Sequence, residues 1–130
     1  MNSNLKKCND ESFTYFDNNE EAVDYSINNK DKTLTCDEEK LINQTIQNII
    51  KQNFSDKAKN SKLYGKQCIV EINKNGDKEV WVNCVFKEDF SISDRKKSII
   101  EVEDGGEYFF NFKMNISKKM YYQPFINGLA

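Results

Sequence analysis

One stretch near the C-terminus, DGGEYFFNFKMNI over residues 104–116, restricts the fold more than any other segment. After its two glycines, apolar side chains recur at every second position, and polar side chains lie between them. This two-residue period is typical of a β-strand with one buried and one solvated face. We therefore expect an antiparallel sheet, because such sheets can keep one face in water. The side chains expected to face the core are Tyr108, Phe110, Phe112, Met114 and Ile116.

The segment TCDEEKLINQTIQNIIKQNF, residues 35–54, predicts a long amphipathic helix. It opens with Thr35 and Glu38 at the spacing of a capping box, in which each residue satisfies a free backbone N–H group of the other. Its other face is polar, so the helix should lie across the apolar face of the sheet with one side in water. The expected buried stripe comprises Leu41, Ile42, Thr45, Ile46, Ile49 and Ile50.

Residues 66–86, KQCIVEINKNGDKEVWVNCVF, predict a β-hairpin around the Asn-Gly pair at 75–76. A two-residue loop would pair the apolar row of the first strand with the polar row of the second. A loop one residue longer, with Gly76 in the left-handed conformation and a bulge, places Val70 opposite Val80. We therefore expect the longer loop.

A second hairpin is expected at the end of the chain. Its strands would be 98–103, SIIEVE, and 108–116, joined by a turn at 104–107. The predicted fold class is α+β, with one amphipathic helix packed on a four-stranded antiparallel sheet of two hairpins, cystatin-like in general architecture. The expected organisation is a polar, partly irregular N-terminal region over 1–34 and a single α+β domain over 35–130.

The composition excludes two classes of partner. Of the 130 residues, 38% are hydrophobic and 31% charged, which suits one folded domain. Nineteen Lys and Arg against 21 Asp and Glu leave no basic surplus, so nucleic-acid binding is not expected. No run approaches the ~18 apolar residues of a membrane span, so no span is expected either.

The sequence gives little support to catalysis. Histidine is absent, which removes the commonest general base and metal ligand near neutral pH. Four acidic residues gather at an expected turn, where contact with water normally keeps the pKa of a carboxyl group near its usual value. They are Glu101, Glu103, Asp104 and Glu107. We therefore expect a protein that is not an enzyme, with no catalytic, cofactor-binding or metal-binding residue and no cofactor.

The four cysteines are Cys8, Cys36, Cys68 and Cys84, and no CxxC pair suggests zinc. In the expected hairpin, Cys68 and Cys84 share one face, directly opposed or diagonal depending on the register. Opposed Cβ atoms lie about 4.5–5.5 Å apart, so a disulfide between them is feasible. In an oxidising compartment we expect Cys68 with Cys84 and Cys8 with Cys36. Four separate reduced thiols remain the alternative.

Several aromatic residues have no evident place in the predicted core. The tail MYYQPFINGLA could either close the edge of the sheet or present an aromatic binding patch. Trp81 and Phe109 fall on rows opposite the core and are expected on the solvated face, unless the N-terminal region covers them. The candidate partner-binding residues are therefore Trp81, Phe109, Tyr121, Tyr122 and Phe125, and the expected partner is a protein.

The C-terminal half carries a pattern of D-G-G, F-N-x-K-x-N, K-K-x-Y-Y and N-G-x-A, preceded by VWVN at 80–83. In this pattern the chain resembles a family of small, uncharacterised exported bacterial proteins that are often lipoprotein-like. The resemblance implies an extracytoplasmic protein after removal of a targeting segment, and it favours disulfides. The matching residues are Asp104, Gly105, Gly106, Phe110, Asn111, Lys113, Asn115, Lys118, Lys119, Tyr121, Tyr122, Asn127, Gly128 and Ala130.

These observations lead to two hypotheses for function. The first is a non-enzymatic binding or accessory protein, secreted, periplasmic or on the cell surface, that holds a protein partner through the open sheet face and the C-terminal aromatic residues. The alternative is a cytoplasmic inhibitor or immunity-type protein that neutralises a toxin or enzyme by burying an acidic face in its active site. Four free thiols would favour the alternative.

Overall fold

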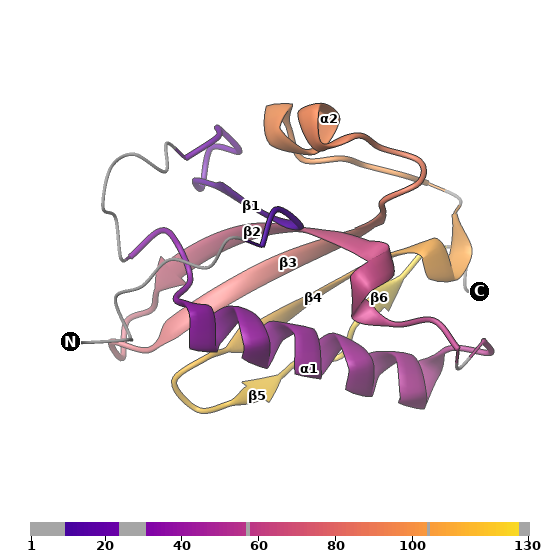
Figure 1. Cartoon of the computed structure of the whole chain (residues 1–130). Coiled ribbons are helices and arrows are strands. Elements are labelled where there is room, and N and C mark those ends of the chain that lie inside the picture. Colours follow the sequence, from indigo (N-terminus) through magenta and orange to yellow (C-terminus); the bar gives the residue numbers. More distant parts are fainter. Residues whose placement is uncertain (1–9, 24–30, 57, 104, 128–130) are drawn as a thin grey trace.

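The computed structural model describes residues 10–23, 31–56, 58–103 and 105–127. One long helix, α1, lies across one face of a mostly antiparallel sheet, and a short helix, α2, lies on the other side (Figure 1). The fold class is α+β, as predicted. In chain order the elements are β1 (Phe13–Phe16), α1 (Cys36–Asn53), the 3-10 turn η2 (Ser61–Leu63), β2 (Tyr64–Ile72), β3 (Lys78–Phe86), α2 (Ile92–Lys97), the 3-10 turn η3 (Gly106–Tyr108), β4 (Phe109–Asn115), β5 (Met120–Tyr121) and β6 (Phe125–Ile126).

In the part of the chain that the structure describes, the sheet has six strands rather than the four expected. Its order is β1-β2-β3-β4-β5, and β6 also pairs with β4. The pairing of β1 with β2 is parallel, and the other pairings are antiparallel. Strand β1 comes from the 1–34 region that was expected to be polar and partly irregular. That region therefore contributes directly to the sheet.

The predicted second hairpin is wrong, because residues 98–103 form no strand. Strand β4 pairs with β3 instead, with Trp81 opposite Lys113 and Asn83 opposite Asn111. Segment 98–103, here called the crossing segment, is bonded by side chains rather than by a neighbouring strand. The side-chain amide of Gln67 donates to the Ser98 carbonyl at 2.7 Å and accepts from the Ile100 N–H at 2.9 Å.

The helix prediction is confirmed. The Thr35 hydroxyl accepts from the Glu38 N–H at 3.2 Å, and the Glu38 carboxylate accepts from the Thr35 N–H at 2.8 Å. The buried side of α1 contributes Ile42, Thr45, Ile46, Ile49 and Ile50. The four isoleucines belong to the same core cluster as Phe110, Phe112, Met114 and Ile116 of the C-terminal strand region.

Tyr108 is the exception to the predicted core row. It lies in η3, before β4 begins, and 44% of its surface is exposed. Its ring packs against Phe86, with ring centroids 4.6 Å apart, and the Lys59 ammonium lies 4.7 Å from its ring centroid. Tyr108 therefore covers the end of the sheet and does not enter the core.

The first hairpin has the expected register. Val70 lies opposite Val80, and Cys68 lies opposite Val82. The loop at 74–76 is closed by a hydrogen bond from the Asn73 N–H to the Asp77 carbonyl at 2.8 Å. Gly76 has φ +82°, the left-handed conformation that glycine adopts without steric cost. The longer, bulged loop is therefore confirmed.

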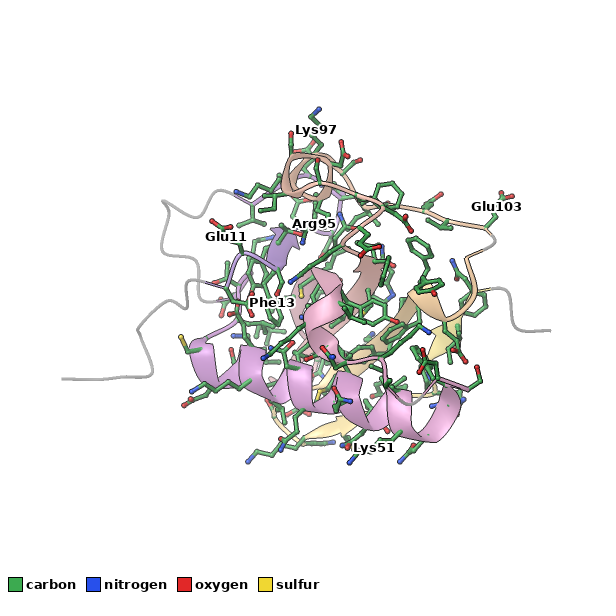
Figure 2. The ribbon with its side chains drawn as sticks, turned by 45° about the vertical axis from the view of Figure 1, so that its right-hand side comes forward. Glu11, Phe13, Lys51, Arg95, Lys97 and Glu103 are labelled. Carbon is green, nitrogen blue, oxygen red and sulfur yellow. The ribbon has the colours of Figure 1, made fainter. Side chains whose placement is uncertain are left out.

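Helix α2 covers one part of the second face, the side of the sheet opposite α1. Arg95 points from α2 toward the sheet (Figure 2), where its side chain is buried. A Cβ added at Gly65 of β2 would lie only 2.5 Å from the Arg95 Cδ atom. Glycine at position 65 therefore leaves the space that this side chain occupies.

The expected Cys68–Cys84 disulfide is wrong, because both residues are free thiols and both are buried. They share one face but are diagonal neighbours, since Lys66 and not Cys68 lies opposite Cys84. Diagonal residues are about 7–8 Å apart, at or beyond the ~7 Å limit for a disulfide. Cys8 lies outside the described residues, so its pairing with Cys36 stays a prediction.

Burial raises the pKa of the Cys68 and Cys84 thiols. Since the thiolate is the reactive form, we expect both to resist iodoacetamide in the folded protein and to react fully in denaturant. Mass spectrometry of peptides from unreduced protein measures both outcomes. A peptide cross-linked through Cys68 and Cys84 would contradict this part of the structure.

The core packing leads to a stability prediction. Replacing Phe110, which is buried under α1, with alanine should lower the free energy of unfolding by about 3–5 kcal/mol. The control is Phe125→Ala, which removes a side chain that is 64% exposed and should cost less than about 1 kcal/mol. Chemical denaturation followed by circular dichroism gives both values. Equal losses would show that the core has been misassigned.

Candidate functional site

Three of the five candidate binding residues lie together on the second face. Trp81 is on β3, and Phe125 pairs directly with Asn111 on the neighbouring strand, so both side chains point to this face. The Tyr122 hydroxyl reaches the same face and donates to the Glu79 carboxylate at 3.4 Å. Phe125 is 64% and Tyr122 48% exposed, whereas Trp81 is half-buried.

The other two candidates are placed differently. Phe109 is on the second face, but it is only 7% exposed and packs edge-on against Phe90, with centroids 6.0 Å apart. Its expected exposure is therefore wrong. Tyr121 points to the α1 side, packs against Phe112 and donates its hydroxyl to Gln52 at 3.3 Å. Neither side chain can form a patch with Trp81.

The C-terminal segment closes the edge of the sheet, which was one of its two expected roles. Strands β5 and β6 both pair with β4, and Ile126 is buried in the core. Successive side chains of a strand point to opposite faces of the sheet. Because Tyr121 and Ile126 point to the α1 side, their neighbours Tyr122 and Phe125 point to the second face. The same short segment therefore both protects an edge and presents aromatic surface.

Two hollows meet at Trp81. The larger, here called the Trp81 cavity, measures about 440 Å³ and is walled by the crossing segment. The smaller, about 180 Å³, has Glu71, Glu79 and Lys113 on its sides. Ile69 and Trp81 border both. The polar and charged side chains that line the Trp81 cavity are Asn18, Glu20, Asn83, Glu101, Asn111 and Asn127.

Side-chain amides build the walls of the Trp81 cavity. The Trp81 indole N–H donates to the Asn111 oxygen at 3.3 Å, which holds the ring in place. The Asn83 amide nitrogen donates to the Gln67 oxygen at 3.0 Å and to the Ile100 carbonyl at 2.8 Å. The Asn127 amide nitrogen donates to the carbonyl of Val102. The crossing segment is thus tied to the sheet from two sides.

The second face is acidic around Trp81. Glu71 and Glu79 lie directly opposite each other on neighbouring strands, a pairing of like charges that destabilises a sheet. The Lys113 ammonium, 3.8 Å from the Glu79 carboxylate, offsets part of this repulsion. Packing within the protein does not explain the free-energy cost of this like-charge pair. The pair therefore marks this position as a candidate binding site.

Two other features, a metal-binding cluster and a membrane-spanning helix, are absent from the part of the chain that the structure describes. Within residues 10–23, 31–56, 58–103 and 105–127, no group of three or more His, Cys, Asp or Glu side chains is placed to hold a metal ion. In the same ranges, no helix combines the length and apolar character that crossing a membrane requires.

No protein-family model, curated protein or solved structure matches the chain.

Three described residues of the C-terminal sequence pattern, Gly105, Gly106 and Asn115, have structural roles. A Cβ at Gly105 would lie 2.1 Å from the Phe109 ring, and Gly106 has φ +55°, which favours glycine. The Asn115 side chain accepts from the Lys118 N–H at 2.9 Å in the turn before β5. Three pattern residues lie outside the described part of the chain, namely Asp104, Gly128 and Ala130.

A second polar cluster lies inside the core, and no pattern in the sequence predicts it. The Tyr15 hydroxyl donates to the Glu39 carboxyl at 2.5 Å, and burial raises the pKa of Glu39 to about 7. Nearby, burial lowers the pKa of Lys66 to about 8, and its ammonium donates to the Ser12 hydroxyl at 3.3 Å. All four side chains are buried, so the cluster affects stability and does not form a surface site.

The buried carboxyl makes stability depend on pH. Its pKa is higher in the folded protein, about 7, than the ~4.3 of an unfolded chain, so folding favours the protonated form. Its contribution should be complete below about pH 4 and lost as the pH rises through 7. Relative to Glu39→Gln, the natural protein should lose on the order of 3 kcal/mol across this range.

Urea denaturation of both proteins from pH 4 to 8 measures the difference. The neutral amide keeps an acceptor for Tyr15, and the charged neighbours Asp10 and Lys66 are the same in both proteins. The comparison therefore isolates Glu39. Parallel stability profiles would mean that this carboxyl does not titrate in the expected range.

Proposed function

We propose that the protein is a non-enzymatic binding or accessory protein that holds a protein partner against the second face. The observation that carries the proposal is the grouping of Trp81, Tyr122 and Phe125 on one face, beside two hollows. Aromatic residues dominate binding energy at protein interfaces, and exposed apolar patches on a folded domain mark interaction sites. The partner would cover aromatic surface that the fold itself leaves open.

The chemistry of the chain supports a binding role over a catalytic one. The sequence has no histidine. Two groups whose pKa values burial shifts toward neutrality, Glu39 and Lys66, lie in the protein interior. A substrate would have no access to these groups, whereas acid–base catalysis requires hydrogen-bond contact with the reacting atoms.

We further propose an extracytoplasmic location, secreted, periplasmic or at the cell surface, because of the resemblance in the C-terminal pattern. The free thiols of Cys68 and Cys84 neither require nor oppose an oxidising compartment, since buried thiols behave as small hydrophobic groups. We also propose that the architecture, a helix on a mostly antiparallel sheet, is cystatin-like in general outline, and we carry no function over from that likeness because fold does not imply function.

A second candidate is a cytoplasmic inhibitor or immunity-type protein, which the opposed Glu71 and Glu79 favour. Burying these carboxylates against a positively charged active site would relieve their repulsion. Both candidates use the same face. They differ in the cell fraction that contains the partner and in whether the partner loses activity on binding.

The test is partner capture by a tagged chain carrying Trp81→Ala, Tyr122→Ala and Phe125→Ala. Loss of interface aromatics should reduce capture at least about tenfold, while circular dichroism stays unchanged. Envelope and cytosolic fractions of the producing cells are compared by quantitative mass spectrometry. The matched control is Ile72→Ala, which removes an exposed side chain from the opposite face.

Capture that is specific and survives the triple substitution would exclude this face as the binding surface. A partner recovered from the envelope would support the extracytoplasmic proposal. A cytosolic enzyme inhibited by the chain would support the second candidate.

A further inference from the structure

Two amide side chains that line the Trp81 cavity, Asn83 and Asn127, use their N–H groups within the protein and leave an oxygen for a ligand. Asn83 is only 8% exposed, and its amide nitrogen donates to two protein oxygens, those of Gln67 and Ile100. Its side-chain oxygen accepts no hydrogen bond from any residue that the structure describes. Asn127 is held in the same way, with its nitrogen toward Val102. What a ligand meets at these two positions is therefore an acceptor.

The charge of the cavity also favours a ligand that donates hydrogen bonds. Two acidic residues, Glu20 and Glu101, line it, and the part of its lining that the structure describes contains no lysine or arginine. Lys113 lies in the smaller hollow, beside Glu79. An anionic ligand would meet repulsion in the Trp81 cavity, whereas a cationic donor would form charge-assisted hydrogen bonds.

The ring of Trp81 adds a third preference. Indole is the best of the aromatic side chains for attracting a cation over its face. The hydrogen bond to Asn111 holds this ring in one orientation, so little freedom is lost when a ligand stacks on it. A planar guanidinium can stack on the ring while its N–H groups reach surrounding oxygens.

From these three properties we propose that the Trp81 cavity binds a cationic side chain, arginine above all and lysine second, presented by the protein partner. This inference rests on the proposed function and specifies the chemistry of the partner. The volume, about 440 Å³, lies in the ~300–1,000 Å³ range of ligand pockets and accommodates such a side chain with adjoining backbone. A neutral sugar fits less well, because its hydroxyl groups need N–H donors as well as acceptors, and the N–H groups of Asn83 and Asn127 are bonded to protein oxygens.

The experiment uses short peptides as probes and the whole protein as receptor. Trp81 is the only tryptophan, so its indole N–H gives a single signal in a ¹⁵N NMR spectrum. Acetyl-Gly-Arg-Gly-amide should shift this signal with a saturable dependence on concentration, and the lysine peptide should do so more weakly. The citrulline peptide, which has nearly the same shape without the charge, should leave the signal in place.

Charge-removing variants locate the contact. Glu20→Gln and Glu101→Gln should each weaken binding of the arginine peptide about threefold. The matched control is Glu103→Gln, on the same crossing segment, because Glu103 points away from the body of the molecule (Figure 2) and is exposed. The Glu103→Gln variant should bind the arginine peptide with the same affinity as the natural protein.

Three results would overturn the inference. They are equal binding of the citrulline and arginine peptides, a larger shift with a neutral disaccharide such as maltose, and no saturable shift up to the solubility limit of the arginine peptide. If one occurs while the triple alanine variant still loses its partner, the proposed function stands with a different ligand chemistry. If the arginine peptide binds but partner capture survives the triple substitution, the cavity is a cation site and the proposed function fails.

Discussion

The structure depends on one contact, the packing of the aliphatic stripe of α1 on the aromatic row of β4. Fully burying each large side chain contributes roughly 1.5–3 kcal/mol to the stability of the fold. The side chains of this contact that make such contributions are Ile46, Ile50, Phe110 and Phe112. Because this face must stay dry, a one-residue slip of any strand would be very costly. The register forced by the core in turn places Trp81 on the opposite face. The binding surface is therefore positioned by the packing on the other side of the sheet.

That second face is shaped by amide side chains more than by backbone pairing. Gln67 and Asn83 bond the crossing segment where a strand was expected, and so hold it above the sheet. A paired strand would extend the sheet at its edge, whereas a segment held by side chains can stand as a wall. The same hydrogen bonds that hold this wall engage the amide nitrogen of Asn83, so this nitrogen is not available to a ligand. Fold and ligand preference thus follow from one set of hydrogen bonds.

Sequence predicted the elements that carry a local signal, namely the capped helix, the hairpin at Gly76 and the alternating strand β4. It missed β1, a four-residue strand without alternation that pairs in parallel with distant β2. Row parity correctly placed Trp81 on the second face, but it could not show that Phe90, in a connecting segment, covers Phe109. The sequence could not predict the buried Glu39 cluster either, because the partners of Glu39 come from β1 and β2, which are distant from it along the chain.

The bond between Asn127 and Val102 ties the outer wall of the cavity to β6, a strand of two residues. Short edge strands are among the first parts of a sheet to open. If β6 separates from β4, the wall loses its latch while α1 and strands β2 to β4 keep their packing. The cavity would then lose one side of its wall without unfolding of the protein, and probes of helix and sheet content would not register the change.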